Sequence, residues 1–430
     1  MTKSKIGVFP NPFRPGAGHM PPYLAGRQHE TDVFLKLLHQ STIVDNMILT
    51  GLRGVGKTVL LDSLKPLAIS NGWLWVGTDL SESASLTEER CALRLLTDLS
   101  VVTAVFPIET EEIRPIGFAA KSELITHRLG FEMLKALYDA TPGLVADKLK
   151  HVLELAWTAV EKTHPKGIVF AYDEAQNLSD HNDKSEFPTS VLLDVFQSIQ
   201  KKGIPFMLVL VGLPTLLPKL VLARTFAERM FHVEFLDKLN ASASRDAILK
   251  PIQDAKCPVK MNESLIASII TMSQGYPYFI QFICREVFDF VIQQIGQGSD
   301  GDITIPVEEI ARKLDSDFFA GRWARATDRQ RDLLAVIAGL PNANDEFTVQ
   351  DVVEKSASVL NKPFSSSHAN QMLAALSDSG LVYKNRHGKY SFAVPLLGQF
   401  ILRQAKERGE QASVRPIPSK RKKGSGPPHE

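Results

Sequence analysis

The sequence predicts an α/β protein with a three-layer core around a parallel sheet, followed by a helical domain and a small C-terminal unit of helices and one hairpin. Three observations favour this fold class. Short apolar runs typical of buried strands alternate with segments that have the apolar spacing of amphipathic helices. One such strand leads through a glycine-rich loop directly into a helix at residues 46–64. After residue 240 the strand signal disappears until a hairpin pattern near residue 381.

The size and composition of the chain narrow the class of protein. At 430 residues it exceeds the length at which one hydrophobic core stops growing, so two or three domains are expected. The 49 Lys and Arg residues balance 48 Asp and Glu residues, so the overall charge indicates neither a nucleic-acid nor a membrane partner. Three scattered cysteines favour a reducing compartment, and no stretch reaches the roughly 18 apolar residues of a membrane span. We therefore expect a cytoplasmic protein with no membrane partner.

The N-terminal segment, residues 1–25, is rich in proline, which excludes a helix. Phe9, Phe13 and Tyr23 give this segment side chains with which to dock, so we expect an extended arm laid over the next domain. A flexible tail is the alternative.

Residues 26–237 are expected to form the α/β core. An amphipathic helix follows Gly26-Arg27, and a later helix is expected to open at a capping box of Ser85 and Glu88. Residues 100–150 are predicted to be a helical insertion, to which we assign no function. The strands of the sheet are predicted at five apolar runs, residues 47–49, 73–78, 167–172, 205–211 and 232–235.

Three further segments follow the core. Residues 238–322 show only helical patterns, so we expect a helical lid domain. Residues 323–405 give three helices and a hairpin that turns at His387-Gly388, which together describe a winged helix. Residues 406–430 are polar and rich in lysine, and are predicted to be a disordered basic tail.

The strand, loop and helix at residues 46–64 contain the Walker A pattern, Gly51-x4-Gly56-Lys57-Thr58. Its glycines let the loop amides point at phosphate oxygens, and the helix adds the positive end of its dipole. Lys57 supplies a charge for the β and γ phosphates, while the Thr58 hydroxyl suits Mg²⁺. The sequence therefore predicts a nucleoside triphosphate with Mg²⁺, bound by the loop residues Gly51, Arg53, Gly54, Val55, Gly56, Lys57 and Thr58.

The acidic pair Asp173-Glu174 ends the third predicted strand. Asp173 is expected to hold Mg²⁺ together with Thr58, through water, because Mg²⁺ keeps much of its hydration shell. Glu174 is expected to orient or deprotonate the attacking water. Alone, such a pair would be an ordinary turn at a strand end, but beside a Walker A loop we expect it to be catalytic.

These motifs resemble those of the AAA+ ATPases, in particular the branch of origin-recognition-like proteins, their bacterial ATP-binding relatives and the STAND switch ATPases. The resemblance covers about residues 26–405, and its specific parts are residues 51–58 and 168–174. It implies a P-loop AAA+ core with a helical lid, ATP as the nucleotide, and assembly into a homo-oligomer or with a partner protein.

The resemblance also implies roles for residues outside the two motifs. Gly26-Arg27 looks like the family's box ahead of the first strand, which places Arg27 near the adenine. Gly275-Tyr276-Pro277 is similar to the lid motif, so Pro277 is expected at the nucleotide. Arg229 stands where the family carries a finger arginine that reaches a neighbouring subunit's γ-phosphate. Arg224 is the alternative finger, and a plain surface arginine is the ordinary explanation for either.

Two departures from the family pattern favour slow hydrolysis. The fourth strand ends in Gly212-Leu213-Pro214-Thr215, so the expected polar sensor is missing unless Thr215 serves. The lid motif also contains no arginine that would act as a second sensor. A slow nucleotide switch is therefore the better expectation.

The winged unit leaves two functions open. Its charge is only mildly basic, with eleven Lys and Arg residues against eight Asp and Glu over residues 323–408. We expect an ATP-dependent switch that controls assembly or binding to double-stranded DNA. The alternative is a STAND-like regulator of a partner protein without DNA binding, and a metabolic kinase is disfavoured because it would leave the winged unit without a purpose. The candidate DNA contacts are Ser366, Ser367, His368, Asn370 and Gln371 in the third helix and Lys384, Arg386 and Lys389 in the hairpin.

Overall fold

The computed structural model divides the chain into two compact units, Met1–Leu314 and Asp315–Glu430. The division falls ahead of residue 322, where the lid was expected to end. Most of the expected basic tail and His387 of the expected hairpin turn lie outside the described residues. In the parts of the chain that are described, no helix is both long and apolar enough to cross a membrane. The described residues are 9–16, 18–113, 123–257, 259–297, 305–343, 345–386 and 388–414.

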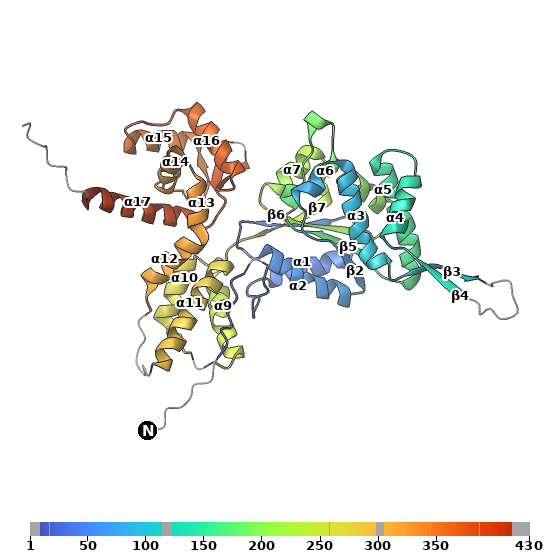
Figure 1. Cartoon of the computed structure of the whole chain (residues 1–430), viewed down its shortest axis with the longest axis horizontal. Coiled ribbons are helices and arrows are strands. Elements are labelled where there is room, and N and C mark those ends of the chain that lie inside the picture. The colour runs from blue at the N-terminus through green and yellow to red at the C-terminus, as the bar shows by residue number, and fades with distance from the viewer. Residues whose placement is uncertain are drawn as a thin grey trace, which may run out of the picture. The chain divides into compact units, whose positions relative to one another are not determined.

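The first unit is built around a five-stranded parallel sheet with the strand order β2-β5-β6-β1-β7 (Figure 1). The predicted α/β class and all five predicted strands are confirmed. β1 lies between β6 and β7, where Met47 pairs with both Val209 and His232. Every residue of β1, β5 and β6 is buried, as expected for parallel strands that are covered on both faces. The bounds are β1 (Asn46–Gly51), β2 (Trp73–Val76), β5 (Gly167–Tyr172), β6 (Phe206–Gly212) and β7 (Phe231–Leu236).

Helices cover both faces of the sheet and complete the three predicted layers (Figure 1). Alternate residues of β1 face opposite layers, because side chains alternate along a strand. Met47 and Leu49 join the apolar cluster with α1 and α2, whereas Ile48 joins the cluster with α3, α5 and α6. The core helices are α1 (Gln28–Leu38), α2 (Lys57–Ser70), α3 (Glu88–Thr103), α4 (Phe131–Ala140), α5 (Val145–Val160), α6 (Pro188–Lys201), α7 (Leu216–Ala223) and α8 (Ala227–Met230).

Part of the expected helical insertion is instead a β-ribbon. β3 (Pro107–Ile113) and β4 (Glu123–Arg128) pair in antiparallel fashion as a separate two-stranded sheet, which projects from the core (Figure 1). The helical expectation was wrong here, where Ile108 and Thr110 alternate with two glutamates over residues 108–111, a short period of two that favours a strand. Over residues 131–150 the helical expectation is confirmed, by α4 and the first part of α5.

The start of α3 also differs from the expected capping box at Ser85. The Thr87 hydroxyl caps the helix by accepting the Arg90 N–H. The Ser85 hydroxyl instead accepts the Ser179 N–H at 2.9 Å. The Ser85 hydroxyl therefore bonds to the loop that follows β5, and Thr87, the next hydroxyl residue along the chain, caps the helix.

Four helices follow β7 in the first unit, and the described residues between 237 and 314 include no strand. Asn240 and Asn262 cap the first two of them by accepting the N–H groups of Ala243 and Leu265. The lid helices are α9 (Ala241–Asp254), α10 (Glu263–Ser273), α11 (Pro277–Gly296) and α12 (Val307–Leu314).

The described part of the N-terminal arm is extended and docks on the lid helices. Asn11 donates from Nδ2 to the carbonyl of Arg285 at 3.0 Å. The buried ring of Phe13 meets Phe288 edge-on at 6.4 Å. Further along, the Tyr23 hydroxyl accepts from Lys250 Nζ at 2.7 Å. The arm is therefore docked rather than a flexible tail, but these contacts are with the lid helices and not with the next domain along the chain, on which it was expected to lie.

The second unit contains every element that was expected of a winged helix. A capping box of Thr327 and Gln330 opens its first long helix. A short strand, β8, extends the hairpin to a three-stranded sheet with the order β8-β10-β9. Assignment to the winged-helix class stays a prediction. The bounds are a π-helical turn at Asp315–Phe319, then α13 (Ala320–Arg325), α14 (Asp328–Ala338), β8 (Phe347–Thr348), α15 (Val349–Val359), α16 (Ser366–Asp378), β9 (Val382–Arg386), β10 (Lys389–Phe392) and α17 (Leu397–Val414).

Candidate nucleotide-binding site

The Walker A loop joins the carboxyl end of β1 to the first turn of α2. Gly54 and Gly56 have φ angles of 79° and 90°, a region that favours glycine. Gly56 is the N-cap residue of α2, and a Cβ atom placed there would meet nothing within 4 Å. Because glycine has no capping side chain, the first amides of α2 are available to an anion. Val55 is buried in the loop, whereas the Arg53 side chain is exposed.

Lys57 places a desolvated ammonium group inside this loop. Its Nζ atom donates to the carbonyl oxygens of Gly51 at 2.9 Å and Leu52 at 3.0 Å. Burial lowers the pKa of Lys57 to about 8, although the nearby charges of Asp173 and Glu174 act in the opposite direction. A phosphate would replace these two carbonyls with stronger, charged acceptors.

Thr58 and Asp173 are in direct contact, with the Thr58 hydroxyl donating to Asp173 Oδ2. Asp173 Oδ1 accepts the Glu174 N–H at 2.7 Å. Burial raises the pKa of Asp173, against the opposing effect of these two hydrogen bonds. A hydroxyl and a carboxylate oxygen are ligands that Mg²⁺ prefers, so the pair fits this ion. Within the described residues, no group of three or more His, Cys, Asp or Glu side chains is placed to hold a metal ion.

Glu174 follows Asp173 at the edge of the sheet, with an exposed side chain and a left-handed backbone at φ 51°. Its Oε2 atom accepts a hydrogen bond from Gln176 Nε2. The charges of both acids raise the pKa of Lys57, because they favour its protonated form. The structure therefore brings Lys57, Thr58, Asp173 and Glu174 into one site. The Walker A loop and the acidic pair were expected to meet in this way.

Arg27 lies beside the loop, but its guanidinium group is bound by the protein itself. Its Nη2 atom donates to the carbonyls of Val55 at 2.9 Å and Asp237 at 2.7 Å, and Nη1 donates to Glu30 at 3.2 Å. Burial lowers the pKa of Arg27. Asp237 begins the linker from β7 to α9, so Arg27 ties the phosphate-binding loop to the lid linker. The sequence did not indicate this clamp.

Pro277 is the first residue of α11, a position that suits proline. The next residue, Tyr278, donates its N–H to the carbonyl of Gly54 at 3.2 Å. The carbonyl of Gly275 accepts the N–H of Leu239, in the lid linker, at 2.9 Å. The lid motif therefore lies directly against the phosphate-binding loop and the linker.

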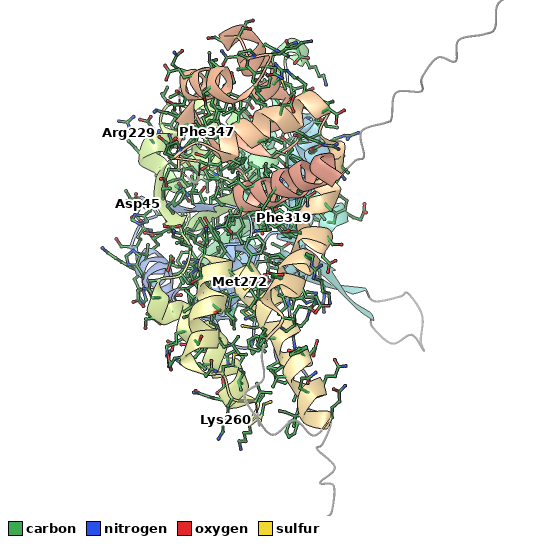
Figure 2. The ribbon with its side chains drawn as sticks, turned by 90° about the vertical axis from the view of Figure 1, so that its left-hand side faces the viewer. Asp45, Arg229, Lys260, Met272, Phe319 and Phe347 are labelled. Carbon is green, nitrogen blue, oxygen red and sulfur yellow. The ribbon has the colours of Figure 1, made fainter. Side chains whose placement is uncertain are left out.

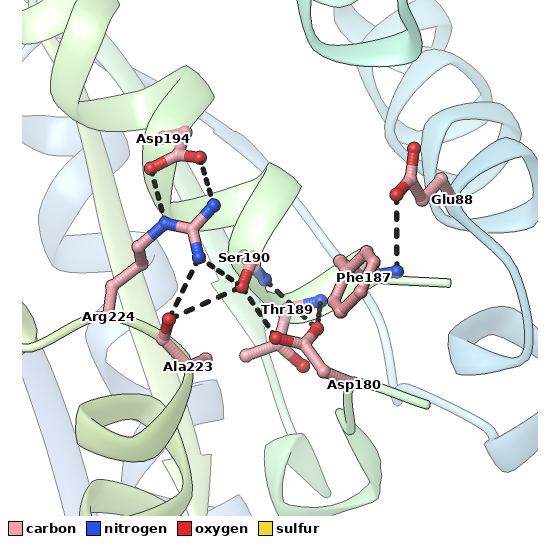
Figure 3. A network of polar contacts seen from close by, with 8 residues as sticks. All are labelled: Glu88, Asp180, Phe187, Thr189, Ser190, Asp194, Ala223 and Arg224. Atoms are coloured by element: carbon pink, nitrogen blue, oxygen red, sulfur yellow. Dashed lines mark hydrogen bonds and ion pairs between the residues drawn. The ribbon is translucent and has the colours of Figure 1, made fainter. Parts of the chain in front are cut away.

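The two finger candidates have different surroundings. Arg229 is exposed at the end of α8, at the margin of the core in Figure 2. Arg224 is held in the network shown in Figure 3, where Nε and Nη2 donate to the two carboxylate oxygens of Asp194 at 2.9 and 2.7 Å. Its Nη1 atom also donates to Ser190 Oγ at 2.8 Å. Arg229 is therefore the better placed of the two to reach a neighbouring molecule.

Gln176 lies beside the end of β6, the strand from which a polar sensor was expected. Leu213, just after β6, donates its N–H to Gln176 Oε1 at 3.0 Å. Lys219 on α7 donates to the backbone carbonyl of Gln176 at 2.7 Å. Sequence reasoning missed both residues, and the one available signal was the position of Gln176 two residues after Glu174.

Two solved structures are similar to this chain over most of its length. The Walker-type ATPase paby2304 of Pyrococcus abyssi is 14% identical, with a TM-score of 0.53, over 88% of this chain and 96% of that one. The ORC2 protein of Aeropyrum pernix in its ADP form is 14% identical, with a TM-score of 0.52, over 93% and 97%. At this identity the likeness shows the fold. A family model described as "Domain of unknown function (DUF8462)" matches residues 316–401, and no curated protein matches the sequence significantly.

Proposed function

We propose that this protein is an AAA+ ATPase of the origin-recognition-like branch that binds ATP with Mg²⁺, hydrolyses it slowly and acts as a nucleotide-dependent switch. The observation that carries the proposal is the contact between Thr58 and Asp173, which are 115 residues apart in sequence, beside the ammonium group of Lys57. The fold shared with a Walker-type ATPase and with an ORC2 protein in its ADP form supports it.

Each residue of the site has a role in this proposal. Lys57 and the amides of residues 53–58 bind the β and γ phosphates. Thr58 and Asp173 hold the Mg²⁺ ion, which neutralises charge on the phosphates when bound. Glu174 accepts a proton from water as the water oxygen bonds to the γ-phosphorus and the bond to ADP breaks. Arg229 of one molecule reaches the γ-phosphate of another in a homo-oligomer.

The low pKa of Lys57 makes ATP binding depend on pH. Phosphate oxygens favour the charged ammonium, so the pKa of Lys57 is higher in the complex than the value of about 8 in the free protein. The stabilisation by this charge is complete below pH 8 and is lost as the pH rises through the window between the two pKa values. We expect the Kd for ATP to rise about fivefold from pH 8 to pH 9. In Lys57→Arg, whose charge persists, titrations should give a Kd independent of pH over this range.

The second unit supplies the output of the proposed switch. On α16, Ser366, Ser367, His368, Asn370 and Gln371 are all exposed. Ser365 caps this helix by accepting the His368 N–H at 3.3 Å. Lys362 and Lys384 are exposed in the same unit, and both can bind phosphates. These features favour contact with double-stranded DNA, with ATP and ADP states differing in affinity.

A duplex titration over a range of salt concentrations, with Mg-ATP or Mg-ADP present, tests the proposed output. We expect an affinity that falls steeply with salt and differs between the two nucleotides. Lys384→Ala should weaken binding and reduce the salt slope by about one. Lys260→Ala, which removes an exposed lysine from the first unit, should change neither. Absence of duplex binding in both nucleotide states would overturn the DNA proposal and leave the STAND-like regulator of a partner protein.

A further inference from the structure

Gln176 lies in the short turn Ala175–Asn177 after β5, and its side chain bridges the ends of two strands. The amide group of Gln176 donates from Nε2 to Glu174 Oε2 and accepts the Leu213 N–H on Oε1 at 3.0 Å. Glu174 follows β5 and Leu213 follows β6. One side chain therefore links the proposed catalytic carboxylate to the end of the neighbouring strand.

The orientation of this amide group is fixed by its partners. The Leu213 N–H can only donate, so the atom that faces it must be the amide oxygen. The NH₂ group must then face Glu174, whose ionised carboxylate can only accept. Both bonds of the link are thus satisfied in one orientation, and a flipped amide would lose both.

The surroundings of Gln176 hold it in this position. Lys219 Nζ donates to its backbone carbonyl from α7 at 2.7 Å. Gly212, the last residue of β6, leaves room for the amide, because a Cβ atom there would lie 2.7 Å from Gln176 Oε1. Gly212 thus permits the close approach, and Leu213 could offer only its backbone to a polar contact.

We propose that Gln176 is a positioning residue for Glu174 and takes over the polar contact that the end of β6 does not supply. Its NH₂ group holds Oε2 of Glu174, which leaves Oε1 to accept the proton from water. Through Leu213 and Lys219, the same residue connects Glu174 to the start of α7, the helix that precedes the Arg229 segment. This inference rests on the proposed ATP hydrolysis.

Gln176→Glu separates positioning from a merely structural role. The new carboxylate still accepts the Leu213 N–H, but it cannot donate to Glu174 and repels it. We expect kcat for ATP hydrolysis to fall about tenfold to a hundredfold, with KM and the Kd for ATP within about twofold of the wild type. Gln176→Leu, which removes both bonds, should show a similar fall in kcat, and its thermal unfolding reports any damage to the fold.

The chain offers a matched control in Gln350, which donates from Nε2 to Glu354 at 2.8 Å on the surface of α15. Gln350→Glu makes the same chemical change beside a glutamate of the second unit and should leave kcat unchanged. A Gln176→Glu protein that hydrolyses ATP at the wild-type rate would overturn the positioning role. A wild-type protein that binds no ATP or hydrolyses none would instead overturn the proposed function itself, so the two failures are distinguishable.

Discussion

Replacement of Lys57 by alanine is expected to abolish ATP binding at nucleotide concentrations that saturate the wild type. The Lys57 ammonium is held inside the loop by the carbonyls of Gly51 and Leu52, at 2.9 and 3.0 Å. Each charge-assisted hydrogen bond to phosphate contributes about 1.5–3 kcal/mol, and Lys57 can make two. We therefore expect the Kd for ATP to rise by at least about a hundredfold. Titration with a fluorescent ATP analogue in the presence of Mg²⁺ measures this change.

Lys65→Ala is the matched control, because Lys65 is exposed on the same helix two turns after Lys57. It should bind ATP like the wild type. The Lys57 variant should remain folded, since removal of a charge that burial disfavours does not expose a core residue. Wild-type affinity in a folded Lys57→Ala protein would show that the loop is not the nucleotide site.

Local sequence patterns predicted the phosphate-binding loop and the strand ends, because the residues of each segment determine its backbone conformation. Gly54 and Gly56 need positive φ angles, and the run at residues 167–172 is apolar throughout because both faces of β5 are covered. The order of the strands was not predictable in this way. The pairing of β1 with β6 and β7 depends on residues more than 150 positions apart, which no local pattern records.

The parts of the site that the sequence did not reveal depend on backbone partners. Arg27 binds the carbonyls of Val55 and Asp237, and every residue type offers a carbonyl. Gln176 is a similar case, because one of the two partners of its side-chain amide is the backbone N–H of Leu213. Backbone partners cannot be recognised from the composition of the sequence or the spacing of its residues, so only the folded structure identifies them. The β3–β4 ribbon was missed for another reason, because the alternating pattern in β3 covers only residues 108–111, and Pro107 and Pro115 lie on either side of it.

Glu174→Gln is expected to separate ATP binding from ATP hydrolysis. The change keeps the size of the side chain, and the new amide oxygen can still accept from Gln176 Nε2. It removes the carboxylate that would take the proton from water. We expect kcat to fall by about a hundredfold to a thousandfold while the Kd for ATP stays within about threefold of the wild type. Phosphate release under saturating ATP and a binding titration provide the two values.

The same experiment tests whether the acid acts chemically or only structurally. Glu161→Gln alters an exposed glutamate at the end of α5 and should leave both values unchanged. If Glu174 only completed the turn after β5, its variant would hydrolyse ATP normally, and a different base would have to be sought. If it is the base, the variant keeps ATP bound for longer, so the ATP-dependent difference in duplex affinity should persist after the wild type has converted its nucleotide to ADP.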